Sequence, residues 1–323
     1  MSEQLLGIPP RGLPISARAP GKCIVFGEHA VVHGAPELVF AIDLTTQLFV
    51  TAGEATRLNA DLEATRRNAY FRSALDLVWK DRSPVEVRAV SRIPKAAGLG
   101  SSAAFVAAFV AALSSATGGV DRPTLAQRSF EVERGAQGVG SPGDTSTVVA
   151  GGFVAINGGP GEPLWSIRSP DRRWEVRRVS DPGWVWVVAY TGIPRSTADA
   201  VRAVGARLAA PGGPELLEEF RRVATEGIDA VGRGDRSAVG ELLVRNQELL
   251  REVGVSHPRL EALLEAAKPA ALGSKLTGAG AGGSVVALPV PGKEAELVRR
   301  LARAGGLPFV VRPVPEGAVL VES

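Results

Sequence analysis

Hydrophobic and polar positions follow two different patterns along the chain, and the change falls near its middle. In the first half, short runs of apolar and β-branched residues predict strands at Cys23–Phe26, Gln47–Thr51, Val85–Val90, Ser146–Ile156 and Trp184–Tyr190. The same half contains two predicted helices, Ser101–Thr117 and Arg122–Gln137. In the second half, helical periodicity predominates and predicts helices at Ser196–Leu208, Glu215–Val231, Ser237–Arg251, Pro258–Ala267 and Glu294–Ala304. Two further strands are predicted there, Ser284–Pro289 and Phe309–Val314.

This order of elements predicts an α+β fold rather than a regular βαβ alternation. Residues 1–17 are rich in Pro and Gly and predict a loose leader. We expect an N-terminal α+β domain over 18–183 and a C-terminal α+β domain over 184–323. No polar linker separates the two, so they are expected to pack closely.

Composition narrows the class of protein. The 323 residues carry 37 basic and 34 acidic side chains, a net charge of +3, and no long basic run, so a nucleic-acid partner is not indicated. The single cysteine, Cys23, excludes an internal disulfide and favours a reducing, cytoplasmic setting. The apolar segment Ala103–Leu113 is too short to span a membrane and predicts a buried helix. The first twenty residues lack the continuous apolar segment of a signal peptide.

Glycine is abundant, with 38 residues against a usual share of about 7%, and its clusters mark the candidate chemistry. The first cluster reads Gly98-Leu99-Gly100-Ser101-Ser102-Ala103 and immediately precedes an apolar helix. A helix start presents unpaired N–H groups and a positive dipole end, glycines let the backbone approach an anion, and a serine hydroxyl can ligate Mg²⁺. The segment taken alone is equally typical of an ordinary serine-capped turn.

Two nucleotide-binding motifs were compared with this loop. Walker A requires Gly-Lys-Ser/Thr, and neither Gly-Lys pair of the chain is followed by Ser or Thr. Gly98–Ala103 does match the dinucleotide pattern G-x-G-x-x-A, and Asp121 stands at about the right distance. That acid should end a second strand, whereas Asp121-Arg-Pro begins a helix here. An NAD-dependent oxidoreductase is therefore only a remote alternative.

Three more segments carry residues of chemical interest. One sets Lys22 before a short strand and Glu28 and His29 after it; another holds Glu133 and, after a Pro-Gly turn, Asp144. The last is a glycine-rich turn before a strand, with Gly278, Gly280 and Gly282. Each has an ordinary structural interpretation when taken singly: a turn former, a solvated helix face, a structural histidine.

Together and in this order, the segments at 19–34, 93–104, 133–147 and 275–284 resemble the mevalonate kinases of the galactokinase–homoserine kinase–mevalonate kinase–phosphomevalonate kinase superfamily. A weaker segment at 246–263 also looks like that family, and the resemblance covers roughly residues 18–315. The Ser-Pro-Gly-Asp form of the third segment is similar to the shorter archaeal-type enzymes. The resemblance implies a two-lobed small-molecule kinase fold that uses ATP and Mg²⁺.

The resemblance also implies a role for each candidate residue. The loop and helix start from Gly98 to Ala103 hold the ATP phosphates, and Ser102 and Glu133 bind Mg²⁺. Asp144 faces the acceptor hydroxyl with Lys22 beside it. The acceptor is contacted by Glu28, His29 and Thr191, and the loop with Gly278, Gly280 and Gly282 supports the site from below.

The acceptor is inferred from the residues after Gly27-Glu28-His29. Galactokinases follow this triplet with Thr-Asp-Tyr, whereas Ala30-Val31-Val32 here favours a small aliphatic acceptor. The resemblance thus implies phosphorylation of the 5-hydroxyl of (R)-mevalonate in isoprenoid synthesis. Other kinases of the superfamily, acting on phosphomevalonate or on the 3-hydroxyl of mevalonate, are the alternatives, and a non-catalytic nucleotide-binding protein is less favoured. Glu37 stands where a small apolar residue is common, and a homodimer is expected from the resemblance alone.

Overall fold

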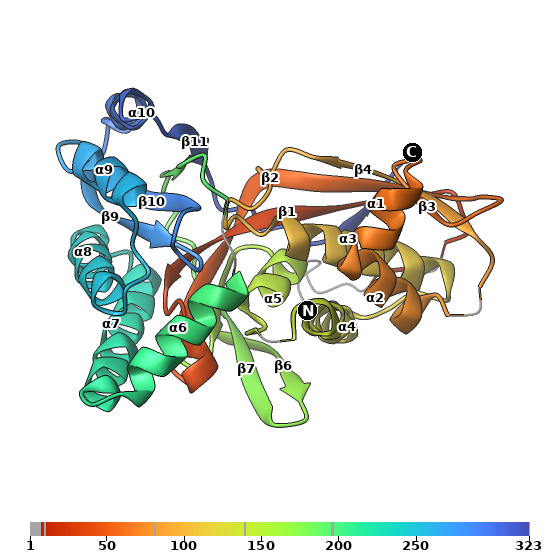
Figure 1. Ribbon diagram of the computed structural model, residues 1–323, viewed down its shortest axis with the longest axis horizontal. Coiled ribbons are helices and arrows are strands. Elements are labelled where there is room, and N and C mark those ends of the chain that lie inside the picture. The colour runs from red at the N-terminus through yellow and green to blue at the C-terminus, as the bar shows by residue number, and fades with distance from the viewer. Residues whose placement is uncertain (1–7, 10, 81, 139, 195–196, 323) are drawn as a thin grey trace.

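The computed structural model describes residues 8–322 except 10, 81, 139 and 195–196, and within them the chain forms two β-sheets (Figure 1). The larger sheet has eight strands in the order β12-β1-β2-β5-β7-β6, with β4 beside β2 and β3 beside β4. Its strands are β1 (Ile15–Phe26), β2 (Glu37–Ala52), β3 (Arg57–Leu58), β4 (Val85–Ser91), β5 (Phe153–Ile156), β6 (Glu162–Ser169), β7 (Arg172–Val179) and β12 (Val319–Val321). The smaller sheet, in the order β11-β8-β10-β9, contains β8 (Trp186–Tyr190), β9 (Ala271–Thr277), β10 (Ser284–Pro289) and β11 (Leu307–Val311).

Helices from both halves of the chain pack on the two sheets. Those of the first half are α1 (Leu62–Arg67), α2 (Ala69–Val78), α3 (Ser101–Ala116), α4 (Arg122–Gln137) and α5 (Gly143–Ala150), after a 3-10 turn at Ala30–His33. Those of the second half are α6 (Thr197–Ala209), α7 (Gly213–Arg233), α8 (Arg236–Glu252), α9 (Pro258–Ala267) and α10 (Glu294–Arg303). Helices α3 and α5 pack on β1 and β2, whereas α8 and α9 pack on β9 at the other end of the molecule (Figure 1). The α+β, two-lobed prediction is confirmed.

Helix α3 lies at the centre of the larger lobe because it is apolar on nearly every side. Twelve of its sixteen residues are buried, as expected for a helix enclosed by other elements. It begins after Gly100, whose φ of 77° is readily adopted only without a side chain. The prediction of a buried helix here is confirmed, and no helix in the described part of the chain is long and apolar enough to cross a membrane.

Helix α4 begins and ends as its sequence predicts. The Asp121 side chain accepts a hydrogen bond from the Thr124 N–H at 2.7 Å, and the helix ends at Gly138 in the left-handed region. Asp121 is thus a helix cap rather than the end of a strand. Within the described residues, all strand pairs except β3–β4 are antiparallel. The dinucleotide-binding alternative, which needs a parallel sheet, is therefore wrong.

Two predictions about local structure are corrected. The run Ser146–Ile156 was expected as one strand, but its first half belongs to α5 and only Phe153–Ile156 is a strand. Seven of the eight α5 residues are buried, and a fully buried run cannot be assigned to helix or strand by periodicity alone. The expected leader is also shorter than predicted, since β1 begins at Ile15 and pairs with both β2 and β12. Residues 1–7 and 10 of the leader, and Ser196 of a predicted helix, lie outside the described residues.

The strands of the two sheets agree only in part with the predicted domain boundary at 183/184. The smaller sheet takes its first strand from Trp186–Tyr190, just after residue 184. The chain nevertheless returns at its end, where β12 pairs with β1 of the larger sheet. The division at 183/184 remains a prediction.

Candidate active site

A cavity of about 760 Å³ is lined by residues of both lobes. Ten of the residues predicted to act line its wall: Lys22, Glu28, His29, Gly98, Gly100, Ser101, Ser102, Glu133, Asp144 and Gly278. Segments far apart in sequence thus meet in one place, as the resemblance implied.

At one end of the cavity, the glycine loop leads into the N-terminus of α3. Gly98 and Gly100 have φ values of 83° and 77°, which turn the chain sharply before Ser101. Helix α3 has no side-chain cap at Gly100, so its first N–H groups are available to an anion in the cavity. A Cβ at Gly100 would lie 2.7 Å from the Lys22 side chain, so glycine is also needed for this close approach.

Lys22 connects the loop to the beginning of α5. Its ammonium lies 2.9 Å from Asp144 Oδ1 and donates a hydrogen bond of 3.1 Å to the Gly98 carbonyl. Its backbone N–H donates to the Leu99 carbonyl at 3.0 Å. The Lys22 side chain is 1% exposed, whereas that of Asp144 is 32% exposed toward the cavity. A fixed cation therefore stands between an anion-binding helix start and a carboxylate that a ligand can reach.

Ser102 and Glu133 lie together beside the helix start, although they come from α3 and α4. Burial, and secondarily the nearby Asp144 carboxylate, raises the pKa of Glu133 to about 8, while a hydrogen bond with Ser102 opposes the rise. Glu133 Oε1 is buried and has no hydrogen-bond partner among the described residues. Among the residues that the structure describes, no group of three or more His, Cys, Asp or Glu side chains is placed to hold a metal ion by itself. A cation here would need further oxygen ligands from a bound phosphate.

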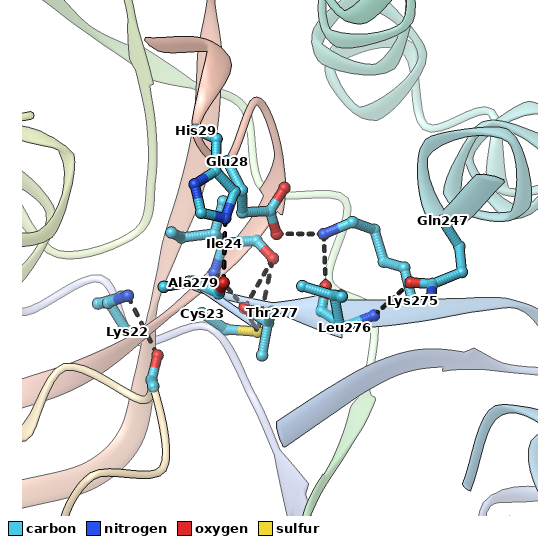
Figure 2. A network of polar contacts seen from close by, with 11 residues as sticks. Lys22, Cys23, Ile24, Glu28, His29, Gln247, Lys275, Leu276, Thr277 and Ala279 are labelled. Atoms are coloured by element: carbon cyan, nitrogen blue, oxygen red, sulfur yellow. Dashed lines mark hydrogen bonds and ion pairs between the residues drawn. The ribbon is translucent and has the colours of Figure 1, made fainter. Parts of the chain in front are cut away.

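At the other end, Glu28 and His29 are held by the second glycine loop (Figure 2). His29 Nε2 forms a hydrogen bond of 3.1 Å with the Ala279 carbonyl, and Glu28 forms a buried ion pair with Lys275 of β9. Burial raises the pKa of Glu28 and lowers that of Lys275, and the attraction within the pair opposes both shifts. The loop thus orients two residues of the cavity wall.

The same loop fastens the smaller lobe to the larger one. The Thr277 hydroxyl accepts from the Ile24 N–H and donates to the Ile24 carbonyl, both at 3.0 Å (Figure 2). The Ser284 hydroxyl donates to the Ala97 carbonyl at 2.8 Å, next to the glycine loop that begins at Gly98. Support therefore comes from the hydroxyls that flank the glycines. Gly278 lines the cavity, whereas Gly280 and Gly282 pack behind it on Val255 and Ile193.

Three predicted contacts are not brought to the cavity. The Thr191 hydroxyl donates to the Gly283 carbonyl at 2.8 Å and accepts from the Ile193 N–H at 3.2 Å, so it shapes the turn instead. Leu99 and Ala103 are buried beneath the loop. Because these two side chains are buried, a ligand in the cavity could contact only the backbone atoms of Leu99 and Ala103.

Sequence reasoning missed two ionisable residues of the site. Lys275 begins the segment 275–284 but has no role in the sequence analysis, although a lysine within a predicted buried segment signals a buried partner. Glu37 was noted only as a departure from the family pattern, and it lies in the cavity wall at 2% exposure. Burial, reinforced by the neighbouring Asp144 carboxylate, raises the pKa of Glu37 to about 8.

Comparison with known proteins agrees with this geometry. Residues 68–152 match the model of the GHMP kinases N terminal domain, and residues 227–306 match that of the GHMP kinases C terminal region. The mevalonate kinase of Pyrococcus abyssi is 32% identical, with 95% of this chain and 98% of the relative aligned. That of Methanothermobacter thermautotrophicus is also 32% identical, over 89% and 94%. The chain therefore belongs to the GHMP kinase family. Within that family, its similarity to mevalonate kinases extends over nearly its whole length.

Solved structures show the same fold. The L. major mevalonate kinase in complex with R-mevalonate superposes with a TM-score of 0.79 at 23% identity, covering 95% of this chain and 99% of that one. The Lactococcus lactis galactokinase complexed with galactose gives a TM-score of 0.74 at 18% identity, over 95% of each chain. Enzymes with different acceptors thus share this architecture.

Proposed function

We propose that this protein transfers the γ-phosphoryl group of ATP to the 5-hydroxyl of (R)-mevalonate. The observation that carries the proposal is the position of Lys22, which contacts Asp144 and the phosphate-loop carbonyl of Gly98 at once. A kinase needs its acceptor oxygen and its phosphates held beside one another, and this lysine joins the two halves of the cavity. The mevalonate kinases similar to the chain along its length support the choice of acceptor.

The residues act as follows. The N–H groups at the start of α3 hold the phosphates, and the ammonium of Lys22 offsets their negative charge. A bond forms between the acceptor oxygen and the γ-phosphorus, and the bond from that phosphorus to the β–γ bridging oxygen breaks, which releases ADP. Asp144 accepts the proton of the acceptor hydroxyl.

Ser102 and Glu133 fit Mg²⁺. Both offer hard oxygen ligands, and the buried Glu133 Oε1 lacks a partner that a cation would supply. When bound, Mg²⁺ would neutralise charge on the phosphate oxygens. A cytoplasmic setting and a homodimer stay predictions.

The acceptor end is consistent with a small, partly apolar molecule. Ile24, Val31 and Val32 line the cavity near Glu28 and His29. Phosphomevalonate, galactose and homoserine are the acceptors of rival kinases, so a panel of these compounds tests the proposal. ADP release with ATP–Mg²⁺ should be fastest with mevalonate, and product analysis should place the phosphate on the 5-hydroxyl. Turnover of another acceptor without turnover of mevalonate would refute it.

The role of Asp144 is tested separately. Asp144→Asn keeps the shape but cannot accept the proton, and we expect kcat to fall about 10²–10⁴-fold with little change in the KM for ATP. Asp171→Asn, at an exposed carboxylate paired with Arg134, is the matched control and should keep the full rate. Full activity of Asp144→Asn would remove Asp144 from the mechanism.

A further inference from the structure

Glu37 is a buried carboxyl in the acceptor part of the cavity, and the mechanism above does not use it. It is the first residue of β2 and lies opposite Ile156 of β5. Its neighbours in the sheet are apolar, yet its side chain turns to the cavity wall with only 2% of the residue exposed. An ionisable group in such a place needs partners to be tolerated.

One oxygen of Glu37 is held by the turn that leads to Asp144. The Ser141 hydroxyl donates to Glu37 Oε2 at 3.1 Å and accepts from the Gly143 N–H at 3.3 Å. The α-carbon of Gly143 lies so close to the same oxygen that a Cβ there would overlap it. The carboxyl of Glu37 therefore packs against Gly143, the residue that precedes Asp144.

The other oxygen, Oε1, has no hydrogen-bond partner among the residues that the structure describes. Oε1 is not fully enclosed by protein, and Glu37 lines the cavity, so this oxygen lies at the cavity surface. A ligand in the acceptor part of the cavity would be its natural partner.

The charges around Glu37 determine whether this oxygen donates or accepts. Three carboxyls gather here with two ammonium groups, and each ammonium already has a carboxylate: Lys22 has Asp144, and Lys275 has Glu28. Glu37 has no cation of its own, and the negative charges of Asp144 and Glu28 disfavour a third. Burial is the largest cause and acts in the same direction, whereas Lys22 opposes it; the pKa of the Glu37 carboxyl is raised to about 8, which favours the protonated form at neutral pH.

Building on the kinase function proposed above, we propose that Glu37 is a specificity-determining residue that donates a hydrogen bond from its protonated carboxyl to an oxygen atom of the acceptor. Oε2 accepts from Ser141 and Oε1–H points to the acceptor. This arrangement favours acceptors with a carboxylate or another hydrogen-bond-accepting oxygen at that point. An apolar residue at position 37 would leave that oxygen without a partner.

Two variants test the proposal by steady-state kinetics. Glu37→Gln keeps an oxygen for Ser141 and N–H donors for the acceptor, so the KM for the acceptor should stay within about threefold of wild type. Glu37→Leu removes both, and a lost hydrogen bond to a charged group should raise that KM about tenfold or more. The KM for ATP should change less than twofold in either variant. Glu175→Gln, an exposed carboxylate on β7, is the matched control and should match wild type.

The pH profile distinguishes a hydrogen-bond donor from a purely structural residue. In wild type, kcat/KM for the acceptor should fall above about pH 8, as Glu37 loses the donated proton. Glu37→Gln has no such proton, so its basic limb should move at least one pH unit higher. Lys22, Asp144, Glu28 and Lys275 face Glu37 in both proteins, and Glu133, whose pKa is also raised to about 8, is unchanged as well, so the contributions of these groups are common to the two profiles.

Two results would overturn the proposal: an unchanged acceptor KM in Glu37→Leu, or coincident basic limbs in wild type and Glu37→Gln. Thermal unfolding and ATP binding of Glu37→Leu verify that the variant is folded. If Glu37→Leu does not fold, the pH comparison with Glu37→Gln decides alone. If wild type phosphorylates an acceptor other than mevalonate, the proposed function fails, and the same kinetics with that acceptor still test Glu37.

Discussion

The buried ion pair between Glu28 and Lys275 provides a quantitative test of how the two lobes are joined. Its side chains are 1% and 0% exposed, and Lys275 also donates to the Leu276 carbonyl at 2.7 Å. Lys275→Met preserves most of the aliphatic stem but leaves the Glu28 carboxylate buried without a cation. Removing one partner of a buried pair costs about 3–5 kcal/mol of the free energy of unfolding. We expect Lys275→Met and Glu28→Gln each to lose an amount in this range.

The double variant separates the pair from its surroundings. Glu28→Gln with Lys275→Met leaves no unpaired charge, so its loss should be smaller than the sum of the two single losses by about 2 kcal/mol or more. Urea unfolding followed by tryptophan fluorescence measures the free energy of unfolding of the two single variants and of the double variant. The comparison requires that their m-values be equal. The exposed pair of Glu63 and Arg67, with side chains 66% and 80% exposed, is the control. Its coupling should be about 0.5 kcal/mol or less.

Strict additivity of the two single losses would refute the reasoning. It would mean that neither charge feels the other, which contradicts a contact between two enclosed side chains. Losses near those of the Glu63–Arg67 control would likewise show that the interior tolerates the unpaired charges.

Three further predictions concern stability and reactivity. Gly280→Ala places a Cβ against the Val255 carbonyl at a positive φ, whereas Gly254→Ala has a similar φ and open space around the Cβ. Gly280→Ala should therefore lower the free energy of unfolding, measured in urea, by about 1–3 kcal/mol more than Gly254→Ala does. Equal losses in the two variants would contradict the overlap. Burial raises the pKa of Cys23 to about 11, so a thiol reagent at pH 8 should label the chain only after unfolding, and rapid labelling of the native protein would contradict its enclosure. The pKa of Glu37 is higher in the folded state than its ordinary 4.5, so the folded protein binds more protons than the unfolded one between about pH 4.5 and 8. Stability should therefore fall as pH rises through that window, by about 1.4 kcal/mol per unit relative to Glu37→Gln, and parallel curves would contradict the shift.

Helices were predicted more accurately than strands, for a physical reason. Pro258–Ala267 was predicted with its observed bounds because a proline and an apolar stripe mark it locally. The larger strands were found only in part: Gln47–Thr51 is a fragment of β2, which spans Glu37–Ala52. Much of β2 is paired on both sides, so its burial depends on partners that the local pattern does not reveal.

The position of a site residue could be predicted where its local sequence determines the backbone conformation there. Gly98 and Gly100 form a turn within their own segment through their positive φ angles, although the contact of Gly100 with Lys22 comes from elsewhere in the chain. Thr191 failed the same test because its hydroxyl donates to the carbonyl of Gly283, which lies 92 residues later in the chain and immediately before β10. Its partner is set by the antiparallel pairing of β8 with β10, which no local pattern contains.

The charge balance around Glu37 is also invisible to motifs, because it is a sum over β1, the turn after it, β2, α5 and β9. Lys22 and Asp144 form one ion pair in the wall. Glu28 adds a carboxylate, and Lys275 from the smaller lobe cancels it, so the pair is neutral before Glu37 is counted. Both ammonium groups near Glu37 already have a carboxylate partner, so burial and the Asp144 charge raise the pKa of this third carboxyl and favour its protonated form. A residue that departs from the family pattern thereby becomes a hydrogen-bond donor in the part of the pocket that faces the acceptor.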